Sequence, residues 1–104
     1  MYKILHLETS MLYKTLIREI SAELSAIYLN AGSAEEAVEH LKHEKVSLIL
    51  TAMELESGSS VEFIKALNES EFKSIPVVVF TGNDSLDDRK RMYDLGIVDY
   101  IDGN

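Results

Sequence analysis

Short apolar runs alternate along the chain with longer segments whose apolar residues recur at helical spacing. The runs predict strands and the longer segments predict helices. Such alternation is typical of a parallel sheet with right-handed crossovers and helices on both faces. Two of the runs contain hardly any polar residue, as expected of strands covered on both faces. We expect strands at 2–7, 26–29, 46–52, 75–81 and 98–101, and helices at 10–24, 33–43, 59–70 and 85–96.

The four helical segments carry start signals and apolar faces. Each begins with a serine, and in three of them an acidic residue follows three positions later, which is a capping pattern. Gly96 ends the fourth segment in a position suited to a left-handed backbone turn. In the first segment Leu12, Leu16 and Ile20 form an i, i+4 stripe that we expect to cover the core. The other expected core residues of the helices are Ile17, Leu24, Ala34, Ala37, Val38, Leu41, Val61, Ile64 and Leu67, and the caps are Ser10, Ser33, Ser59 and Ser85.

Composition and charge narrow the class of protein. With 104 residues, of which 46% are apolar, the chain is long enough for one domain, residues 1–104, and too short for two. It has no cysteine, which excludes disulfides and thiolate metal sites and fits a reducing cytoplasm. The start of the chain is no signal peptide, and no run approaches the roughly 20 apolar residues that span a membrane. The net charge of -8 repels phosphate backbones, so we expect no direct nucleic-acid binding.

The predicted topology also indicates where a functional site would lie. In open parallel sheets, sites lie beyond the carboxyl ends of the strands, near the point where the strand order reverses. The sequence offers no glycine-rich phosphate loop and no Ser/His/Asp arrangement, which a flavin carrier or a small hydrolase would need. The candidate residues that follow the strands are Glu8 and Thr9, Ala52 to Glu54, Thr81 to Asn83, and Asp102 to Asn104.

Five segments of the sequence resemble one signalling family. They are KILHLETS at 3–10, AGSAEEAV at 31–38, SLILTAMELESGSSVEFI at 47–64, IPVVVFTG at 75–82 and GIVDYI at 96–101. Over essentially the whole chain they are similar to the receiver (CheY-like) domains of two-component response regulators. The resemblance implies an α/β, three-layer, flavodoxin-like (doubly wound) fold, with a five-stranded parallel sheet in the order 2-1-3-4-5. It also implies a cytoplasmic function in phosphorelay signal transduction.

The resemblance further implies a reaction whose residues are mostly absent from this chain. In the family, an aspartate takes a phosphoryl group from a histidine kinase. Two acidic residues hold a divalent cation, and a hydroxyl and a lysine contact the phosphate. The matching acidic positions are Glu8 and Thr9, the acceptor position is Ala52, the hydroxyl is Thr81 and the lysine position is Gly103. Glu54 lies on the acceptor loop. Ala52 has no nucleophilic atom, and a single carboxylate is a poor Mg²⁺ site.

We therefore interpret the chain as a degenerate receiver, or pseudo-receiver, that signals through protein contacts without phosphorylation. We expect no enzymatic activity, no catalytic residue and no cofactor. Mg²⁺ binding should be weak or absent, with Glu8 as the one weak candidate ligand. The alternative is an active phosphotransfer receiver with a non-standard acceptor, although serine and threonine are poor acceptors without a general base. The substitutes near Ala52 are Thr51, Glu54, Glu56, Ser57, Ser59 and Ser60.

Other candidate residues have structural interpretations beside the functional ones. Thr81 and Tyr100 match the family's switch pair, but a structural role is the favoured interpretation. His6 could bind a metal or act as an acid or base. For this residue we favour a buried neutral imidazole with one hydrogen bond. His40 and His43 lie three residues apart on the second helix, and two ligands alone do not make a metal site.

Receiver domains normally carry a helix after the fifth strand, and this sequence stops at DYIDGN. Without that helix, one face of the strand at 75–81 is left to the first helix alone, so we expect an exposed apolar patch. Three explanations compete: an N-terminal segment of a longer protein with an output domain, burial of the patch in a dimer, or tolerated exposure. We prefer the first. By analogy with family dimers, we also expect self-association through the fourth helix and fifth strand.

Overall fold

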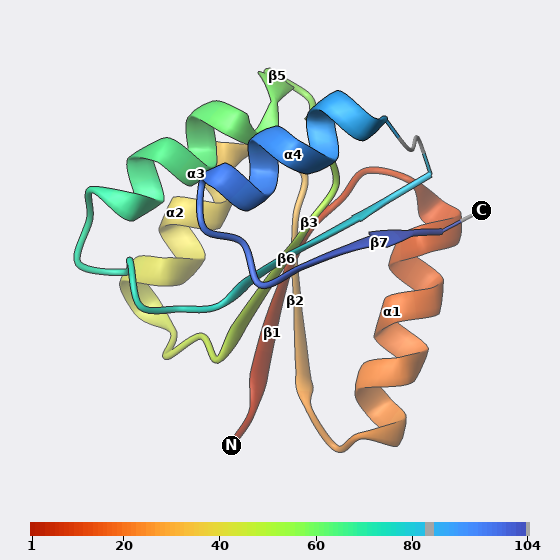
Figure 1. Cartoon of the computed structure of the whole chain (residues 1–104). Coiled ribbons are helices and arrows are strands. Elements are labelled where there is room, and N and C mark those ends of the chain that lie inside the picture. The colour runs from red at the N-terminus through yellow and green to blue at the C-terminus, as the bar shows by residue number, and fades with distance from the viewer. Residues whose placement is uncertain (83–84, 104) are drawn as a thin grey trace.

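In the computed structural model, which describes residues 1–82 and 85–103, five parallel strands form one sheet flanked by four helices (Figure 1). The sheet order β2-β1-β3-β6-β7 is the predicted 2-1-3-4-5 in the chain order of its strands. The elements are β1 Lys3–Leu7, α1 Met11–Glu23, β2 Ile27–Ala31, α2 Ala34–His43, β3 Leu48–Thr51, β4 Glu54–Leu55, β5 Gly58–Ser59, α3 Ser60–Asn68, β6 Val77–Thr81, α4 Leu86–Asp94 and β7 Asp99–Asp102.

A two-stranded hairpin, β4 and β5, lies between β3 and α3, where the sequence predicts only a loop. Glu54 pairs with Ser59, and Leu55 pairs with Gly58, in antiparallel register. Gly58 has a φ of 124°, a conformation that glycine adopts without the strain a side chain would bring. Strands of two residues are too short to show an alternating pattern, which explains why the sequence did not reveal them.

Parallel pairing brings the carboxyl ends of the strands to one edge of the sheet. Leu7 of β1 pairs with Ala31 of β2 and with Thr51 of β3. Thr81 of β6 pairs with Asp102 of β7, and β3 pairs with β6. The segments that leave β1, β3 and β6 therefore lie next to one another, at the point where the strand order reverses.

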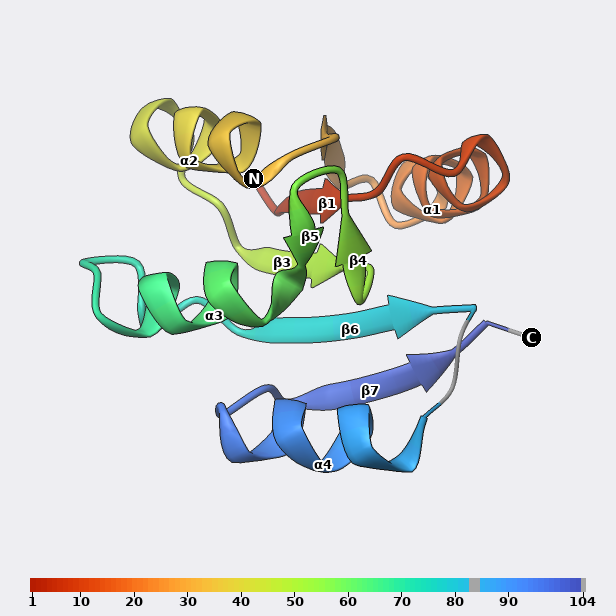
Figure 2. The same cartoon turned by 90° about the horizontal axis from the view of Figure 1, so that it is seen from above.

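The larger hydrophobic core lies between the sheet and helices α2, α3 and α4, which cover one face (Figure 2). Val61, Ile64 and Leu67 of α3 are buried there as predicted. Val38 of α2 differs from the prediction, because 38% of it is exposed. The larger buried side chains that complete this core are Leu5, Leu7, Ile49, Met53, Phe63, Val79, Met92 and Tyr100.

Among the described residues, α1 is the one helix on the opposite face (Figure 2). The core beneath it is small and centres on Ile4, Leu50 and Phe80. Leu48 and Val78, on the same face, are only partly buried. No residue of β6 is exposed, because Val78 is partly buried and the others are buried, so this strand does not form the exposed apolar patch that the sequence predicts.

The leucine stripe of α1 does not cover the core, which corrects the sequence-based expectation. Leu12 is 73% exposed, and Leu16 and Ile20 are each 41% exposed. The helix instead turns Ile17 and Ser21 toward the sheet, and the fully buried Ser21 hydroxyl donates to the Ile17 carbonyl at 2.7 Å. Helical periodicity identifies the apolar face of a helix, but it does not show which part of that face packs against the sheet.

Serine caps form at all four helix starts, as predicted. Ser59 caps α3 by accepting a hydrogen bond from the Val61 N–H, two residues on, and not from Glu62 as a capping box requires. Gly96 has a φ of 93° after α4, which confirms the predicted left-handed turn. The other three caps are Ser10, Ser33 and Ser85, which accept from Tyr13, Glu36 and Asp88 respectively.

The contrast between the buried face of α3 and the exposed stripe of α1 predicts a measurable difference in stability. Ile64→Ala should lower the free energy of unfolding by about 2–5 kcal/mol, because Ile64 is only 1% exposed and its removal leaves a cavity. Leu12→Ala should change it by less than about 0.5 kcal/mol. Urea titrations followed by circular dichroism measure both values. Equal losses in the two variants would show that the α1 stripe is buried in solution.

Candidate functional site

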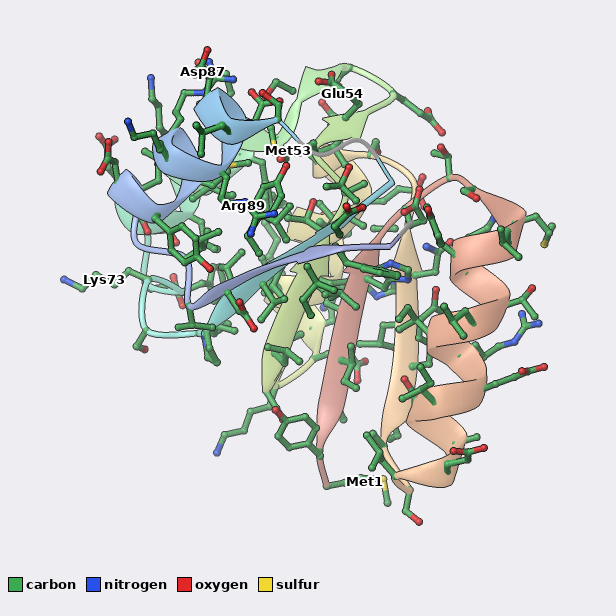
Figure 3. The ribbon with its side chains drawn as sticks, turned by 45° about the vertical axis from the view of Figure 1, so that its right-hand side comes forward. Met1, Met53, Glu54, Lys73, Asp87 and Arg89 are labelled. Carbon is green, nitrogen blue, oxygen red and sulfur yellow. The ribbon has the colours of Figure 1, made fainter. Side chains whose placement is uncertain are left out.

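An open pocket of about 230 Å³ lies where β1, β3 and β6 end. Four of the residues that the sequence singles out line it, so the predicted strand-end site exists as a cluster in space. Figure 3 shows Met53 and Glu54 at this end of the sheet, where the chain passes from β3 into the β4–β5 hairpin. Its lining comprises the predicted Glu8, Ala52, Glu54 and Thr81 together with Ser10, Tyr13 and Gly82.

Two predicted site residues lie outside this lining. The Thr9 side chain is exposed, and its backbone N–H donates to Glu8. The Gly103 N–H donates to the Thr81 carbonyl at 2.7 Å, which extends the pairing of β6 with β7. Of the remaining strand-end candidates, Gly82 lines the pocket, Met53 is buried in the core and Asp102 ends β7. Asn83 and Asn104 lie outside the described residues.

The Glu8 carboxylate is the more buried of the two acidic groups that line the pocket, beside the exposed Glu54, and it already has partners in the chain. Only 6% of Glu8 is exposed. Its Oε2 accepts hydrogen bonds from the backbone N–H groups of Thr9 and Ser10, each at 3.1 Å. These bonds stabilise the tight connection from β1 into α1. The Glu8 carboxylate therefore has a structural role, as a hydrogen-bond acceptor, that does not require a bound cation.

The family's divalent cation does not fit the donor set of this pocket. A hard cation such as Mg²⁺ prefers several oxygen ligands, usually two carboxylates together with water. Here Thr9 and Ala52 supply no carboxylate, and one oxygen of Glu8 is shared with two backbone N–H groups. The other carboxylate of the lining, Glu54, is an exposed residue of the β4–β5 hairpin. Among the described residues, no group of three or more His, Cys, Asp or Glu side chains is placed to hold a metal.

Ala52, which the family resemblance assigns to the acceptor position, lines the pocket and presents only a methyl group. Its backbone N–H donates to the Leu7 carbonyl at 3.0 Å, which continues the β1–β3 pairing beyond Thr51. The residue is 7% exposed, so the methyl group is packed into the pocket floor. A hydrocarbon side chain has no lone pair with which to attack phosphorus.

The hydroxyls of the substitute acceptors do not line the pocket. The Thr51 hydroxyl is fully buried and donates to the Ala52 carbonyl at 2.9 Å. Ser59 caps α3, and Ser60 is buried at the first position of that helix. Among the substitute acceptors proposed from the sequence, Glu54 is the one that lines the pocket.

Tyr13 is the pocket residue that sequence analysis missed. A Cβ built on Gly82 would lie 2.5 Å from the Tyr13 hydroxyl oxygen, and one built on Gly103 would lie 3.1 Å from it. The Tyr13 ring packs against Phe80 with 5.0 Å between centroids. The phenol thus fills the space next to the family's lysine position. Two glycines near the ends of the last two sheet strands are the sequence signal, but only the fold shows which ring they admit.

Tyr100 is packed inward beneath a cation. Only 4% of it is exposed, and the Arg89 guanidinium carbon lies 4.7 Å from the centre of its ring. Figure 3 shows Arg89 reaching from α4 toward β7. Thr81, the other member of the predicted pair, is 5% exposed and lines the pocket. Contacts within the chain therefore hold Tyr100 in the core.

His6 is a fully buried imidazole beside β2. Its Nδ1 and the Tyr28 hydroxyl are joined by a 2.8 Å hydrogen bond. Its Nε2 has no hydrogen-bond partner among the described residues. Burial, with a smaller effect from the positive charge of Lys14, lowers the pKa of His6 to about 4. The structure thus agrees with a neutral histidine that makes one hydrogen bond.

The two histidines of α2 point to different partners. The His40 Nε2–H donates to the Asn30 carbonyl at 3.0 Å, which ties α2 to β2. His43 Nε2 lies 3.3 Å from Glu39 Oε1 on the exposed side of the helix. His40 therefore has a structural partner, and the two rings do not converge on one site.

Comparison with known proteins identifies relatives of the chain. Residues 4–102 match the model of the response regulator receiver domain. The phosphate regulon transcriptional regulatory protein PhoB of Escherichia coli K12 is 38% identical over 74 residues, which cover 70% of this chain and 32% of PhoB. The match thus spans about a third of the length of this curated relative.

Solved structures show the same fold. A response regulator receiver protein from Pseudomonas putida superimposes with a TM-score of 0.90 at 19% identity, covering 98% of this chain and 85% of that one. The phosphorylated cyanobacterial phytochrome response regulator RcpA has a TM-score of 0.90 at 25% identity, covering 99% and 81%. The Mn²⁺-bound response regulator Rcp1 has a TM-score of 0.86 at 22% identity, covering 100% and 82%.

The buried His6 predicts a loss of stability in mild acid. Unfolded histidine takes up a proton near pH 6.5, whereas folded His6 does so only near pH 4. Between these values the unfolded state binds more protons, so the His6 contribution to stability falls by up to about 3 kcal/mol as the pH drops. Urea titrations at pH 7, 6, 5 and 4 measure it. His6→Gln, which does not titrate, should show a shallower pH dependence, and an unchanged slope would contradict the assignment.

The contact between Tyr13 and the glycines predicts a coupled pair of substitutions. Gly82→Ala should lower the free energy of unfolding by about 1–3 kcal/mol, because the new methyl group meets the Tyr13 hydroxyl. In a Tyr13→Phe background the nearest ring carbons lie 3.3 and 3.4 Å away, so the same substitution should cost less. A double-mutant cycle by thermal denaturation measures the coupling. A coupling free energy of zero would show that Tyr13 lies elsewhere.

Proposed function

Because this chain belongs to the response regulator receiver domain family, we propose that it is a signalling module that controls a partner protein or an output domain without being phosphorylated. The observation that carries the proposal is Ala52, a methyl group at the acceptor position of an intact strand-end pocket. A receiver fold with an alanine at the position that the resemblance assigns to the phospho-acceptor supports the proposal, because this side chain has no nucleophilic atom.

Three features of the site support this proposal. Glu8 is hydrogen bonded to backbone N–H groups, so its charge already has partners without a cation. The Tyr13 phenol fills the space next to Gly103, where a phosphate-binding lysine would have to pass. Arg89 covers the inward ring of Tyr100, so a phosphate is not required to hold that ring in the core. Signalling would then proceed through surface contacts, and we expect no enzymatic activity.

A second candidate function is phosphotransfer with a non-standard acceptor. Glu54 favours it, because this carboxylate lies on the acceptor loop and lines the pocket. Among the solved relatives, RcpA is described in a phosphorylated form and Rcp1 in a Mn²⁺-bound form. In the present chain, Glu54 would have to take the place of an aspartate at position 52. Glu54 lies two residues further along the chain and has a longer side chain. We consider it the weaker proposal for that reason.

The partners of the domain are also proposals. An output domain in a longer protein agrees with the match to about a third of PhoB. A homodimer through α4 and β7 is supported by exposed apolar residues there, with Tyr93 and Ile101 each 43% and Val98 60% exposed. Within the described residues, no helix is long and apolar enough to cross a membrane. We retain the prediction of a cytoplasmic location, since the chain has no cysteine.

Small phosphodonors test the proposal directly. Incubation with acetyl phosphate and Mg²⁺ should leave the mass of the chain unchanged, because no nucleophilic oxygen lies at position 52. Beryllofluoride with Mg²⁺ should produce no saturable change in amide chemical shifts. Incorporation of one acid-labile phosphate per chain would establish the second function instead, and Glu54→Gln would then show whether that carboxylate is the acceptor.

A double variant tests whether Mg²⁺ fails to bind because ligands are missing or because it cannot enter the pocket. Thr9→Asp combined with Ala52→Asp adds two carboxylates beside Glu8, so Mg²⁺ should now shift the amide signals of the strand ends. Thr9→Asn combined with Ala52→Asn has nearly the same shape without the charge and should not respond. A response of the asparagine pair equal to that of the aspartate pair would contradict the explanation by missing ligands.

A further inference from the structure

A groove runs along the outer surface between α2 and α3, which lie side by side over one face of the sheet (Figure 2). Its wider part has a volume of about 530 Å³ and reaches the N-termini of the two helices. A narrower part of about 160 Å³ continues it toward Phe72. Val38, Phe63 and Ala66 line both parts, so the two form one continuous depression. The strand-end pocket shares none of its lining residues with this groove.

Small side chains in the lining keep this groove open. Ala34 of α2 and Ala66 of α3 leave a gap that larger residues would close. Phe63 forms the floor and is only 6% exposed, whereas Val38 on the wall is 38% exposed. Covering this apolar surface would stabilise a complex by about 25 cal/mol for each Å² removed from water.

Carboxylates gather at the wider end of the groove. Glu35 and Glu62 line it from the first turns of α2 and α3. The Glu36 and Glu56 carboxylates converge nearby, since a Cβ built on Gly32 would lie 2.9 Å from Glu56 Oε1 and 3.4 Å from Glu36 Oε1. The two carboxylates that line this end, with Glu36 and Glu56 beside Gly32, create a negative potential that attracts cationic groups.

Cations of the chain itself neutralise this end only weakly. Lys65 lies 3.9 Å from Glu62 in an exposed pair, which contributes little. Lys42, the one basic side chain in the groove lining, lies 3.7 Å from Glu39 and comes from the last turn of α2. The groove is therefore acidic at the helix N-termini and carries its positive charge nearer the helix C-termini.

The charge of the groove decides between occupants. A second copy of the chain brings a net charge of -8, and nucleic acids and anionic membranes bring phosphates, so the acidic end disfavours all three. We propose that the groove docks an amphipathic helix of a partner protein. This helix has an apolar face, with lysine or arginine side chains at the end that lies over Glu35 and Glu62.

The part of the groove beside α2 is about two turns of helix long. From Ala34 to Lys42, α2 rises by about 12 Å. A docked helix would place apolar side chains at positions i, i+3 or i+4, and i+7 against the groove, which is a recurring mode of peptide recognition. Val38, Phe63 and Phe72 provide successive apolar contacts along its length.

The inference rests on the proposed function, in that it names the surface through which a domain without an acceptor would signal. The two nevertheless fail separately. Phosphate incorporation would overturn the proposed function and leave the groove intact. Absence of groove binding would overturn the inference and leave Ala52 without a nucleophile.

The test uses a synthetic helical peptide of about 18 residues with one leucine face and lysines at one end. We expect micromolar binding by isothermal titration calorimetry. In amide spectra the largest shifts should fall on α2 and α3, at Val38, Phe63 and Ala66. A peptide with the same composition in scrambled order, which has no apolar face, should bind at least about tenfold more weakly.

Matched variants show which surface binds. Ala66→Arg fills the groove at an exposed helix position and should weaken binding at least about tenfold. Val38→Arg is a second variant on the facing wall, used if the first does not fold. Leu12→Arg introduces the same side chain on the exposed stripe of α1 and should leave the affinity unchanged. Circular dichroism checks that each variant is folded.

Charge reversal tests the orientation of the peptide. Glu62→Lys at the acidic end should weaken binding about threefold or more, and this effect should shrink at high salt. Glu23→Lys, on α1, is the control for the change in net charge. Equal losses for Ala66→Arg and Leu12→Arg, equal binding of the scrambled peptide, or shifts confined to α1 would each overturn the proposal. Self-association abolished by Ala66→Arg would also overturn it, since the occupant would then be a second copy.

Discussion

The backbone N–H of Ala52 donates to the Leu7 carbonyl at 3.0 Å, and the Glu8 N–H donates to the Ala31 carbonyl at 3.0 Å. These two hydrogen bonds continue the parallel pairing of β1 with β2 and β3 by one residue beyond the ends of the strands. They place Glu8 next to position 52 whatever side chain that position carries. A change at position 52 can therefore remove chemistry without removing the fold.

Local rules were sufficient for the alternation of strands and helices and for the helix starts, because alternation and capping serines act within a few residues. The strand order was predicted from the family resemblance, not from local rules. Local rules failed where the answer depends on a neighbour distant in sequence. The stripe through Leu12 is helical, but its burial requires a packing partner on that side. Tyr13 enters the pocket only because the fold brings it over Gly82 and Gly103. Glu8, Ala52 and Thr81 could be placed together because parallel strands end at one edge.

The strand-end pocket and the α2–α3 groove differ in how their polar groups are used. In the pocket, Glu8 is hydrogen bonded to the backbone, and Tyr13 fills the space beside Gly103. In the groove, Glu35 and Glu62 surround an apolar floor. The first arrangement stabilises the chain that contains it, whereas the second leaves charge and apolar surface exposed to solvent. Of the two, the groove on the helices is therefore the surface better suited to contact with another protein.

The free edge of β7 has a consequence for how the domain associates. The Tyr100 N–H is directed to the Asp99 carboxylate at 2.8 Å and to the Tyr93 hydroxyl at 3.1 Å. Side chains of the same chain thus occupy a donor that an incoming strand would use, and the acidic residues of β7 add electrostatic repulsion. The sheet is thereby protected against extension by strands from other molecules, which lowers the risk of edge-to-edge aggregation.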